Sequence, residues 1–326
     1  MENLKAPFPY FGGKRAVAEA VWEALGNPAH YIEPFFGSGA VLLARPGWNP
    51  DMTETVNDKD GFLCNVWRSL QLSPDETAKW CDWPVNHADL IARRKVLLAG
   101  ESMLLENLCK DDVWHDVKLA GYWIWAASCW IGTGLTRPNA IPHVGDAGKG
   151  KIPHVSHAGM GIHAKGQIPH VSNALLSDPF KESIYSDFRK LAERLRGVRV
   201  VCGDWNRVCN GKWQEKIGIC GMFFDPPYDG LERDTELYHH DSTTVTHDAF
   251  EWCLDRGKNP NYRIVFAGYE EHEEKARAAG WGVESWKANG GYGNTARDGK
   301  DSRGKQNSNR ERLYFSPHCI KRNTLL

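Results

Sequence analysis

Short runs typical of strands alternate with helical periodicities along the first seventy residues of the chain. Residues 31–35 and 53–57 have the length and composition of strands, and each run leads into turn-forming residues. Residues 40–44 continue as the start of a helix, and residues 61–70 repeat their apolar positions at helical spacing. This part of the chain is therefore predicted to alternate strands with helices.

Residues 74–135 have a different pattern, in which helical spacing dominates. Segments 74–80, 89–99, 102–108 and 116–130 are predicted helices, and no strand signal between them is strong. We therefore expect a helical insert in this part of the chain.

The alternating pattern returns near residue 183. Helices are predicted over 183–196 and 270–279, and strands over 198–202, 219–224, 263–267, 283–286 and 313–316. Such alternation predicts an α/β fold with a largely parallel sheet and helices on both of its faces. Residues 1–73 and 183–326 would form one discontinuous domain, and residues 74–182 a mainly helical insert. Ligands bind these sheets outside the carboxyl ends of the strands.

The composition and charge exclude only a few classes of protein. The 326 residues carry a net charge of −1, so any nucleic-acid surface must be a local basic patch. No stretch approaches the ~20 apolar residues that span a bilayer, and the first residues lack the layout of a signal peptide, so a cytoplasmic protein is expected. Nine cysteines without a C-x-x-C pair indicate buried free thiols rather than a zinc site.

The first segment with candidate chemistry is E-P-F-F-G-S-G, from Glu33 to Gly39. Glycine lets a backbone turn sharply or approach a ligand closely, and a following helix offers free N–H groups. A plain strand-to-helix turn is the alternative. The dinucleotide fingerprint is incomplete because Leu42 occupies its last position. Gly12-Gly13-Lys14 likewise lacks the upstream glycine and the following Ser or Thr of a P-loop.

An acidic residue, Asp58, follows these glycines by about 20 residues, at the end of the second predicted strand. A carboxylate at this offset commonly accepts hydrogen bonds from ribose hydroxyls. The alternative is an N-cap for the helix that follows. The preceding glycine motif favours the ribose.

The most specific segment is Asp225-Pro226-Pro227-Tyr228, which follows the apolar run 219–224. Two prolines fix the backbone and remove two N–H donors, which leaves the carbonyls and the carboxylate as acceptors. Such a site suits a substrate amine, and Tyr228 offers a flat face on which a base can stack. A proline-stiffened turn without chemistry is the alternative.

The order of these motifs resembles the Dam-type adenine-specific DNA methyltransferases. An aromatic residue followed by G-G-K, here within P-Y-F-G-G-K at residues 9–14, precedes E-P-F-x-G-x-G and then DPPY. The matching motifs cover residues 1–70 and 183–230, and more loosely 260–316. The resemblance implies a Rossmann-like sheet that binds S-adenosylmethionine and releases S-adenosylhomocysteine.

The resemblance also implies a set of cofactor residues. Asp58 would hold the ribose hydroxyls, Asp204 would reach the adenine of the cofactor, and Phe35 would line the pocket with the glycines. The implied cofactor residues are Tyr10, Gly12, Gly13, Lys14, Glu33, Pro34, Phe35, Gly37, Ser38, Gly39, Asp58, Asp204 and Asp225.

For the target base, the resemblance implies that Asp225 and the Pro226 carbonyl hold the amino group, within a turn stiffened by Pro227. Tyr228 would stack on the base. The methyl group would pass directly from the sulfonium to the N6 atom of an adenine flipped out of double-stranded DNA. Positioning and electrostatics would supply most of the acceleration, and no cysteine nucleophile is needed.

Residues 74–182 occupy the place of the target-recognition region. They contain I-P-H-V three times, at 141–144, 152–155 and 168–171, in a loop that either lies along DNA or has grown by duplication. A second basic loop, at 297–312, either clamps the DNA backbone or is merely solvated. Metal binding by the His-rich loop is a further alternative, although no ligand spacing there is diagnostic of it. The candidate DNA contacts are Arg137, His143, Lys149, Lys151, His154, His170, Arg297 and Arg303.

Related activities differ at the first residue of DPPY. Cytosine-N4 enzymes more often carry Ser there and RNA enzymes often carry Asn, so Asp225 favours adenine. A catalytically silent DNA-binding relative is the alternative from another class, and the intact motifs argue against it. A cognate restriction endonuclease is a candidate partner, and a solo enzyme of this kind fits a bacterium or a bacteriophage.

Overall fold

The computed structural model describes residues 4–8, 10, 14–84, 86–130, 135–136, 184–211, 216, 218–227, 245–286 and 310–320. The chain packs as two units. Residues 1–3, 11–57 and 197–326 belong to the first, which we call the sheet unit. Residues 4–10 and 58–196 belong to the second, which we call the helical unit.

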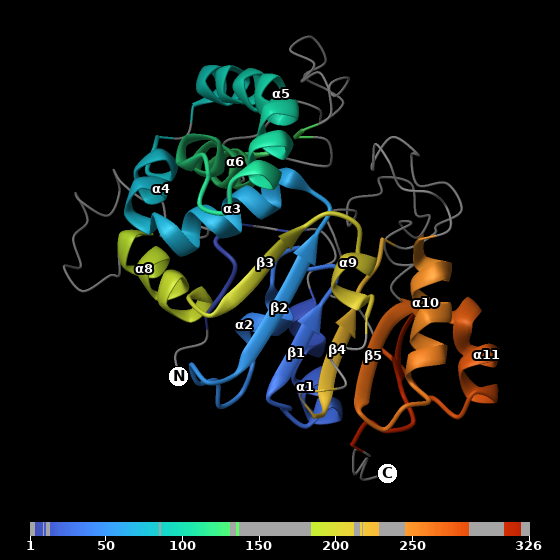
Figure 1. Ribbon diagram of the computed structural model, residues 1–326. Helices are drawn as coiled ribbons and strands as arrows, with labels where there is room; N and C mark the ends of the chain where they lie inside the picture. The colour runs from blue at the N-terminus through green and yellow to red at the C-terminus, as the bar shows by residue number, and fades with distance from the viewer. Residues whose placement is uncertain are drawn as a thin grey trace, which may run out of the picture. The chain divides into compact units, whose positions relative to one another are not determined.

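The sheet has the order β3-β2-β1-β4-β5-β7-β6 in the part of the chain that the structure describes. The strands are β1 (His30–Glu33), β2 (Thr53–Asp58), β3 (Val198–Cys202), β4 (Cys220–Phe224), β5 (Tyr262–Tyr269), β6 (Gly282–Ser285) and β7 (Glu311–Phe315) (Figure 1). β1 is parallel to β2 and β4, with Ile32 beside Thr55 and Met222, and β4 is parallel to β5. β7 runs antiparallel to β5 and β6. The strand order reverses between β1 and β4, which is where ligands bind in sheets of this kind.

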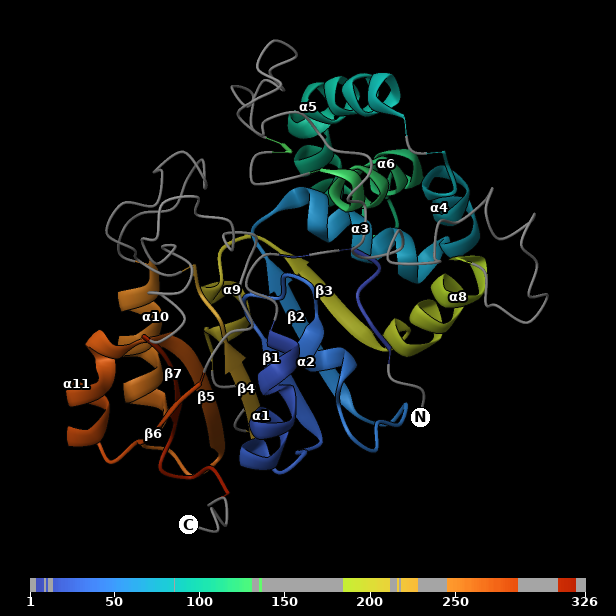
Figure 2. The ribbon, with the colours of Figure 1, turned by 180° about the vertical axis from the view of Figure 1, so that it is seen from behind.

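Helices cover both faces of this sheet, as the sequence predicts. The helical segments of the sheet unit are η1 (Lys14–Val17), α1 (Ala18–Leu25), α2 (Ala40–Leu43), α9 (Asn206–Cys209), α10 (Val245–Arg256), η5 (Glu270–His272) and α11 (Glu273–Ala278). The two opposite views place α1 and α2 on one face and α9 and α10 on the other (Figures 1 and 2). β4 is buried along its whole length, because both of its faces are covered.

The core of the sheet unit is formed by the inner strands and α10. Phe224 and Phe266, on neighbouring strands, pack with Phe250 and Cys253 of the helix. α10 does not appear among the predicted helices, although its buried residues recur at helical spacing: Thr246, Ala249, Phe250, Cys253 and Leu254. The sequence therefore carries a helical signal over α10, with one face packed on the sheet.

The helical unit contains α3 (Gly61–Leu72), α4 (Pro74–Cys81), α5 (His87–Lys110), α6 (Val117–Cys129) and α8 (Ile184–Leu195). α6 packs against α3, α4 and α5, while α8 packs against α3 and α4. The unit therefore extends over residues 58–196, whereas the sequence placed the insert at 74–182. The boundary differs because α3 buries its apolar face, including Trp67, among these helices.

α5 is one continuous helix, although two helices were predicted over 89–99 and 102–108. Gly100 lies between the two predicted segments and faces α6. A Cβ atom at this position would lie 3.0 Å from the Leu119 side chain, so the glycine allows the two helices to approach closely.

Arg93 contacts several aromatic side chains of the helical unit. The Arg93 guanidinium lies 4.9, 4.3 and 4.4 Å from the ring centroids of Trp83, Tyr122 and Trp125, and it also donates to the Trp80 carbonyl. Arg93 is buried, so these contacts replace part of its lost hydration. Several of the chain's 14 tryptophans therefore have a structural role here.

The cysteines are free throughout the part of the chain that the structure describes, and six of them are buried, as the sequence predicts. Within the same residues no helix combines the length and apolar character needed to cross a membrane.

Candidate functional site

The turn after β1 is shaped by two glycines. Gly37 and Gly39 have φ of 49° and 62°, in the left-handed region that favours glycine. The Gly39 N–H donates to the Phe36 carbonyl at 2.8 Å, and a Cβ at Gly39 would lie 2.7 Å from the Phe36 ring. The turn therefore excludes any larger residue at Gly39. The helix that follows, α2, is a single turn of four residues.

A buried amide joins this turn to the ends of two other strands. Asn57, near the end of β2, donates from Nδ2 to the carbonyls of Pro34 and Gly203, each at 3.0 Å. Its own carbonyl accepts from the Phe36 N–H at 2.9 Å. The carboxyl ends of β1, β2 and β3 are thus tied together through one residue, to which the sequence pattern assigned no role.

Asp58 is the last residue of β2, and it does not cap the next helix. The N-cap of α3 is Asp60, whose carboxylate accepts from the N–H groups of Phe62 and Leu63 at 2.8 and 3.4 Å. Asp58 instead accepts from the Asp60 N–H at 2.9 Å. The alternative of an N-cap role for Asp58 is therefore wrong. Burial, with a smaller contribution from Asp58, raises the pKa of Asp60 to about 7.

Asp225, directly after β4, forms an ion pair with Lys14. Lys14 Nζ lies 2.8 Å from Asp225 Oδ1, and the two side chains are 5% and 21% exposed. The Trp286 ring lies 5.5 Å from the same ammonium. The Thr246 hydroxyl donates to the Pro227 carbonyl, which fixes the turn from the first residues of α10. The structure thus connects the G-G-K segment with the DPPY segment, 211 residues later.

A second carboxyl group, that of Glu33 at the end of β1, lies close enough to Asp225 to interact with its charge. Glu33 is almost fully buried and accepts a hydrogen bond from the Tyr31 hydroxyl at 2.9 Å. Burial raises the pKa of Glu33 well above its ordinary value; the Tyr31 bond opposes this rise and the nearby Asp225 charge adds to it. Glu33 is therefore held as a buried group, and its expected contact with a cofactor stays a prediction.

Aromatic rings gather at the same ends of the strands. The Phe35 ring lies 6.2 Å from those of Trp205 and Phe224, and Trp252 lies 5.5 Å from Phe224. Trp205 follows Asp204 after β3 and is only half-buried. Trp205 has no predicted role, although its position directly after the candidate adenine-binding carboxylate Asp204 is a signal that the sequence carries.

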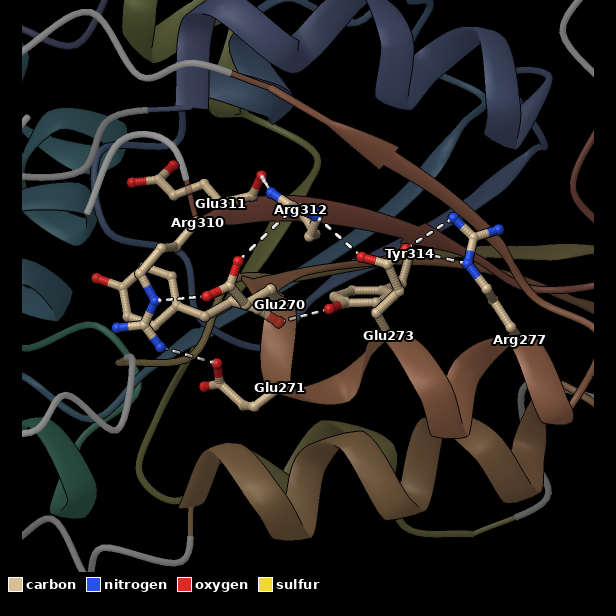
Figure 3. Close-up of polar contacts among 9 residues, drawn as sticks. Glu270, Glu271, Glu273, Arg277, Arg310, Glu311, Arg312 and Tyr314 are labelled. Atoms are coloured by element: carbon tan, nitrogen blue, oxygen red, sulfur yellow. Dashed lines mark hydrogen bonds and ion pairs between the residues drawn. The ribbon is translucent and has the colours of Figure 1, made fainter. Parts of the chain in front are cut away.

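The arginines at the end of the second basic loop are already paired. Arg310 contacts Glu270 and Glu271 at 3.1 and 3.5 Å, and Arg312 contacts Glu273 at 3.2 Å (Figure 3). These bonds join β7 and the residue before it to η5 and α11. The two arginines are paired with glutamates of their own chain, and the expectation that residues 297–312 clamp DNA stays a prediction.

The remaining candidate residues divide into two groups. Two of them are described. Ser38 lies between Gly37 and Gly39 in the turn after β1 and is half-buried. Tyr10 belongs to the helical unit, is 39% exposed and lies with its ring 6.4 Å from that of Phe8. The others lie outside the described residues: Gly12, Gly13, Tyr228, Arg137, His143, Lys149, Lys151, His154, His170, Arg297 and Arg303. The described residues contain no group of three His, Cys, Asp or Glu side chains that could hold a metal ion.

Residues 10–91 match the family model of the D12 class N6 adenine-specific DNA methyltransferases. The matched segment contains the turn after β1 and Asp58, whereas β4 and Asp225 lie outside it. A comparison with curated proteins finds no significant match. The family match confirms the resemblance that the motifs carry, agrees with the mixed α/β sheet, and indicates an adenine-specific DNA methyltransferase.

Proposed function

We propose that this chain, which the match over residues 10–91 indicates to be an adenine-specific DNA methyltransferase, transfers the methyl group of S-adenosylmethionine to N6 of an adenine flipped out of double-stranded DNA. The observation that carries the proposal is the position of Asp225. It lies at the carboxyl end of β4, beside β1, where the strand order reverses.

The turn after β4 is built from acceptors. Pro226 and Pro227 have no N–H, so the Asp225 carboxylate and the Pro226 carbonyl are the groups offered to a substrate. An exocyclic amine has two N–H donors, which two such acceptors satisfy. Their acceptance of these hydrogen bonds increases electron density on N6 and orients its lone pair. Lys14 holds one carboxylate oxygen in place, which favours a fixed direction for the other.

The residues at the ends of β1, β2 and β3 fit an adenosine-containing cofactor. Asp58 and Asp204 supply carboxylates for the ribose hydroxyls and the adenine amino group, and Phe35 and Trp205 supply aromatic faces. When bound, S-adenosylmethionine supplies a methyl group activated by a sulfonium.

Some of the expected contacts with the substrate lie in the helical unit rather than in the sheet unit. Double-stranded DNA is the substrate that the family match implies. The DNA contacts within 137–170 and at Arg297 and Arg303 remain predictions, as does a partner endonuclease. A cytosine-N4 or RNA activity and a catalytically silent relative remain the alternatives that the experiment below addresses.

The experiment compares Asp225→Ala with wild-type protein in methyl transfer from labelled S-adenosylmethionine to unmethylated DNA. Asp225→Ala is expected to abolish transfer and to leave DNA affinity within about threefold of wild type, because the carboxylate acts on the reacting amine. Asp255→Ala is the matched control: it removes a carboxylate that is 76% exposed and pairs only loosely with Lys258, at 3.4 Å. Near-normal turnover by Asp225→Ala would refute the proposed role.

A further inference from the structure

The buried side chain of Asn57 links the turns that follow two of the strands. It is 1% exposed, and its Nδ2 group donates both of its hydrogens, to the Pro34 carbonyl and to the Gly203 carbonyl. The Oδ1 atom is buried and has no hydrogen-bond partner among the described residues. The hydrogen bonds that the Asn57 side chain makes among the described residues are therefore the two that its Nδ2 group donates.

The chemistry of these two bonds is specific to an amide. One planar NH₂ group presents two donors at a fixed angle, and each carbonyl accepts one of them. An aspartate has the same shape but would place one carboxylate oxygen, at the position of Nδ2, against both carbonyls. An alanine would leave both carbonyls without their donor in a buried place, which is unfavourable.

The two carbonyls belong to different parts of the proposed cofactor site. The Pro34 carbonyl begins the turn that carries Phe35 and the glycines, and the Gly203 carbonyl directly precedes Asp204 and Trp205. The end of β2, which carries Asn57 itself, is joined to the first of these turns by the backbone hydrogen bond from the Phe36 N–H to the Asn57 carbonyl. One side chain thus sets the separation of the two turns.

We propose that Asn57 is a positioning residue for the cofactor: it holds the turn at residues 34–39 and the turn at residues 203–205 at the spacing that binds adenosine. The proposal rests on the proposed function, because it takes S-adenosylmethionine as the ligand. Asn57 touches neither the cofactor nor the target base. Its loss weakens cofactor binding and leaves the chemistry at Asp225 intact once the cofactor is bound.

The test measures S-adenosylmethionine affinity by calorimetry for wild type, Asn57→Asp and Asn57→Ala. Both variants are expected to raise Kd, and the KM for the cofactor, by roughly tenfold or more, with kcat at saturating cofactor within about threefold of wild type. The matched control is Asn65→Ala. Asn65 is also 1% exposed and exchanges two hydrogen bonds with the Asp116 backbone, at 2.9 and 2.8 Å, in the helical unit. Its loss is expected to lower thermal stability and to leave Kd within about threefold.

Unchanged affinity in folded Asn57 variants would overturn the proposal, as would an equal loss of affinity in Asn65→Ala. Should the Asn57 variants not fold, amide hydrogen exchange on the wild-type protein decides. Joint protection of residues 34–39 and 203–205 by the cofactor supports the proposal, and protection of one turn alone overturns it. A wild-type protein that does not bind S-adenosylmethionine at all would refute the proposed function itself, and this inference with it.

Discussion

The ion pair between Lys14 and Asp225 leads to a prediction about the chemical step. Lys14→Met keeps the apolar stem and removes the ammonium, which lies 2.8 Å from the carboxylate. A hydrogen bond to a charged group contributes about 1.5–3 kcal/mol. The side chains are only 5% and 21% exposed, so solvent replaces this bond poorly. At about 1.36 kcal/mol for each factor of ten, loss of this bond in the transition state lowers kcat by roughly 10- to 150-fold.

The assay is single-turnover methyl transfer with the cofactor and DNA at saturating concentrations. Lys258→Met is the control, because Lys258 forms a 3.4 Å pair with Asp255 in which both side chains are about three-quarters exposed, and such pairs contribute little. A kcat for Lys14→Met within about twofold of wild type would show that the ion pair does not contribute to the chemical step. A raised KM for the cofactor at unchanged kcat would instead place Lys14 on the cofactor, as the resemblance implies.

Three further predictions follow from single contacts. Glu54→Gln removes the negative charge that lies 2.9 Å from the buried Arg45 guanidinium, and we expect the free energy of unfolding to fall by about 3 kcal/mol in urea titrations; an unchanged midpoint would contradict this. Asp60→Asn keeps the helix cap but does not titrate. The pKa of Asp60 is raised from 3.8 to about 7 in the folded protein, so wild type loses stability relative to the variant as the pH rises through this range. A difference in Tm between the two proteins that does not change with pH would contradict this. Thr246→Val removes the hydroxyl that fixes the Pro227 carbonyl, and kcat should fall by about tenfold or more with recovery in Thr246→Ser; equal rates in both variants would count against this role.

The sheet and the main site segments could be predicted from the sequence because their signals are local. An apolar run followed by glycines, by Asp58 or by two prolines identifies a strand and the end that carries chemistry, and the structure places each of these at the carboxyl end of a strand. Burial of β4 on both faces follows from its uninterrupted apolar run.

The remaining features depend on tertiary contacts between distant segments. Lys14 meets Asp225 across 211 residues, and Asn57 bridges to Gly203 across 146, so no local spacing reveals either contact. α5 was divided at Gly100 because glycine normally weakens a helix, whereas here it allows close contact with α6. Arg310 and Arg312 gave a basic signal in the sequence, and only the structure reveals the glutamates that neutralise them.

The identity of the methylated nucleoside decides whether the protein acts on adenine and does so through Asp225. Unmethylated bacterial DNA is incubated with wild-type protein and labelled S-adenosylmethionine, digested, and examined by mass spectrometry and by sequencing that reports modified bases. The account predicts N6-methyladenine within a fixed short sequence, which disappears with Asp225→Ala. N4-methylcytosine as the product, or N6-methyladenine that persists in the Asp225→Ala reaction, would contradict it.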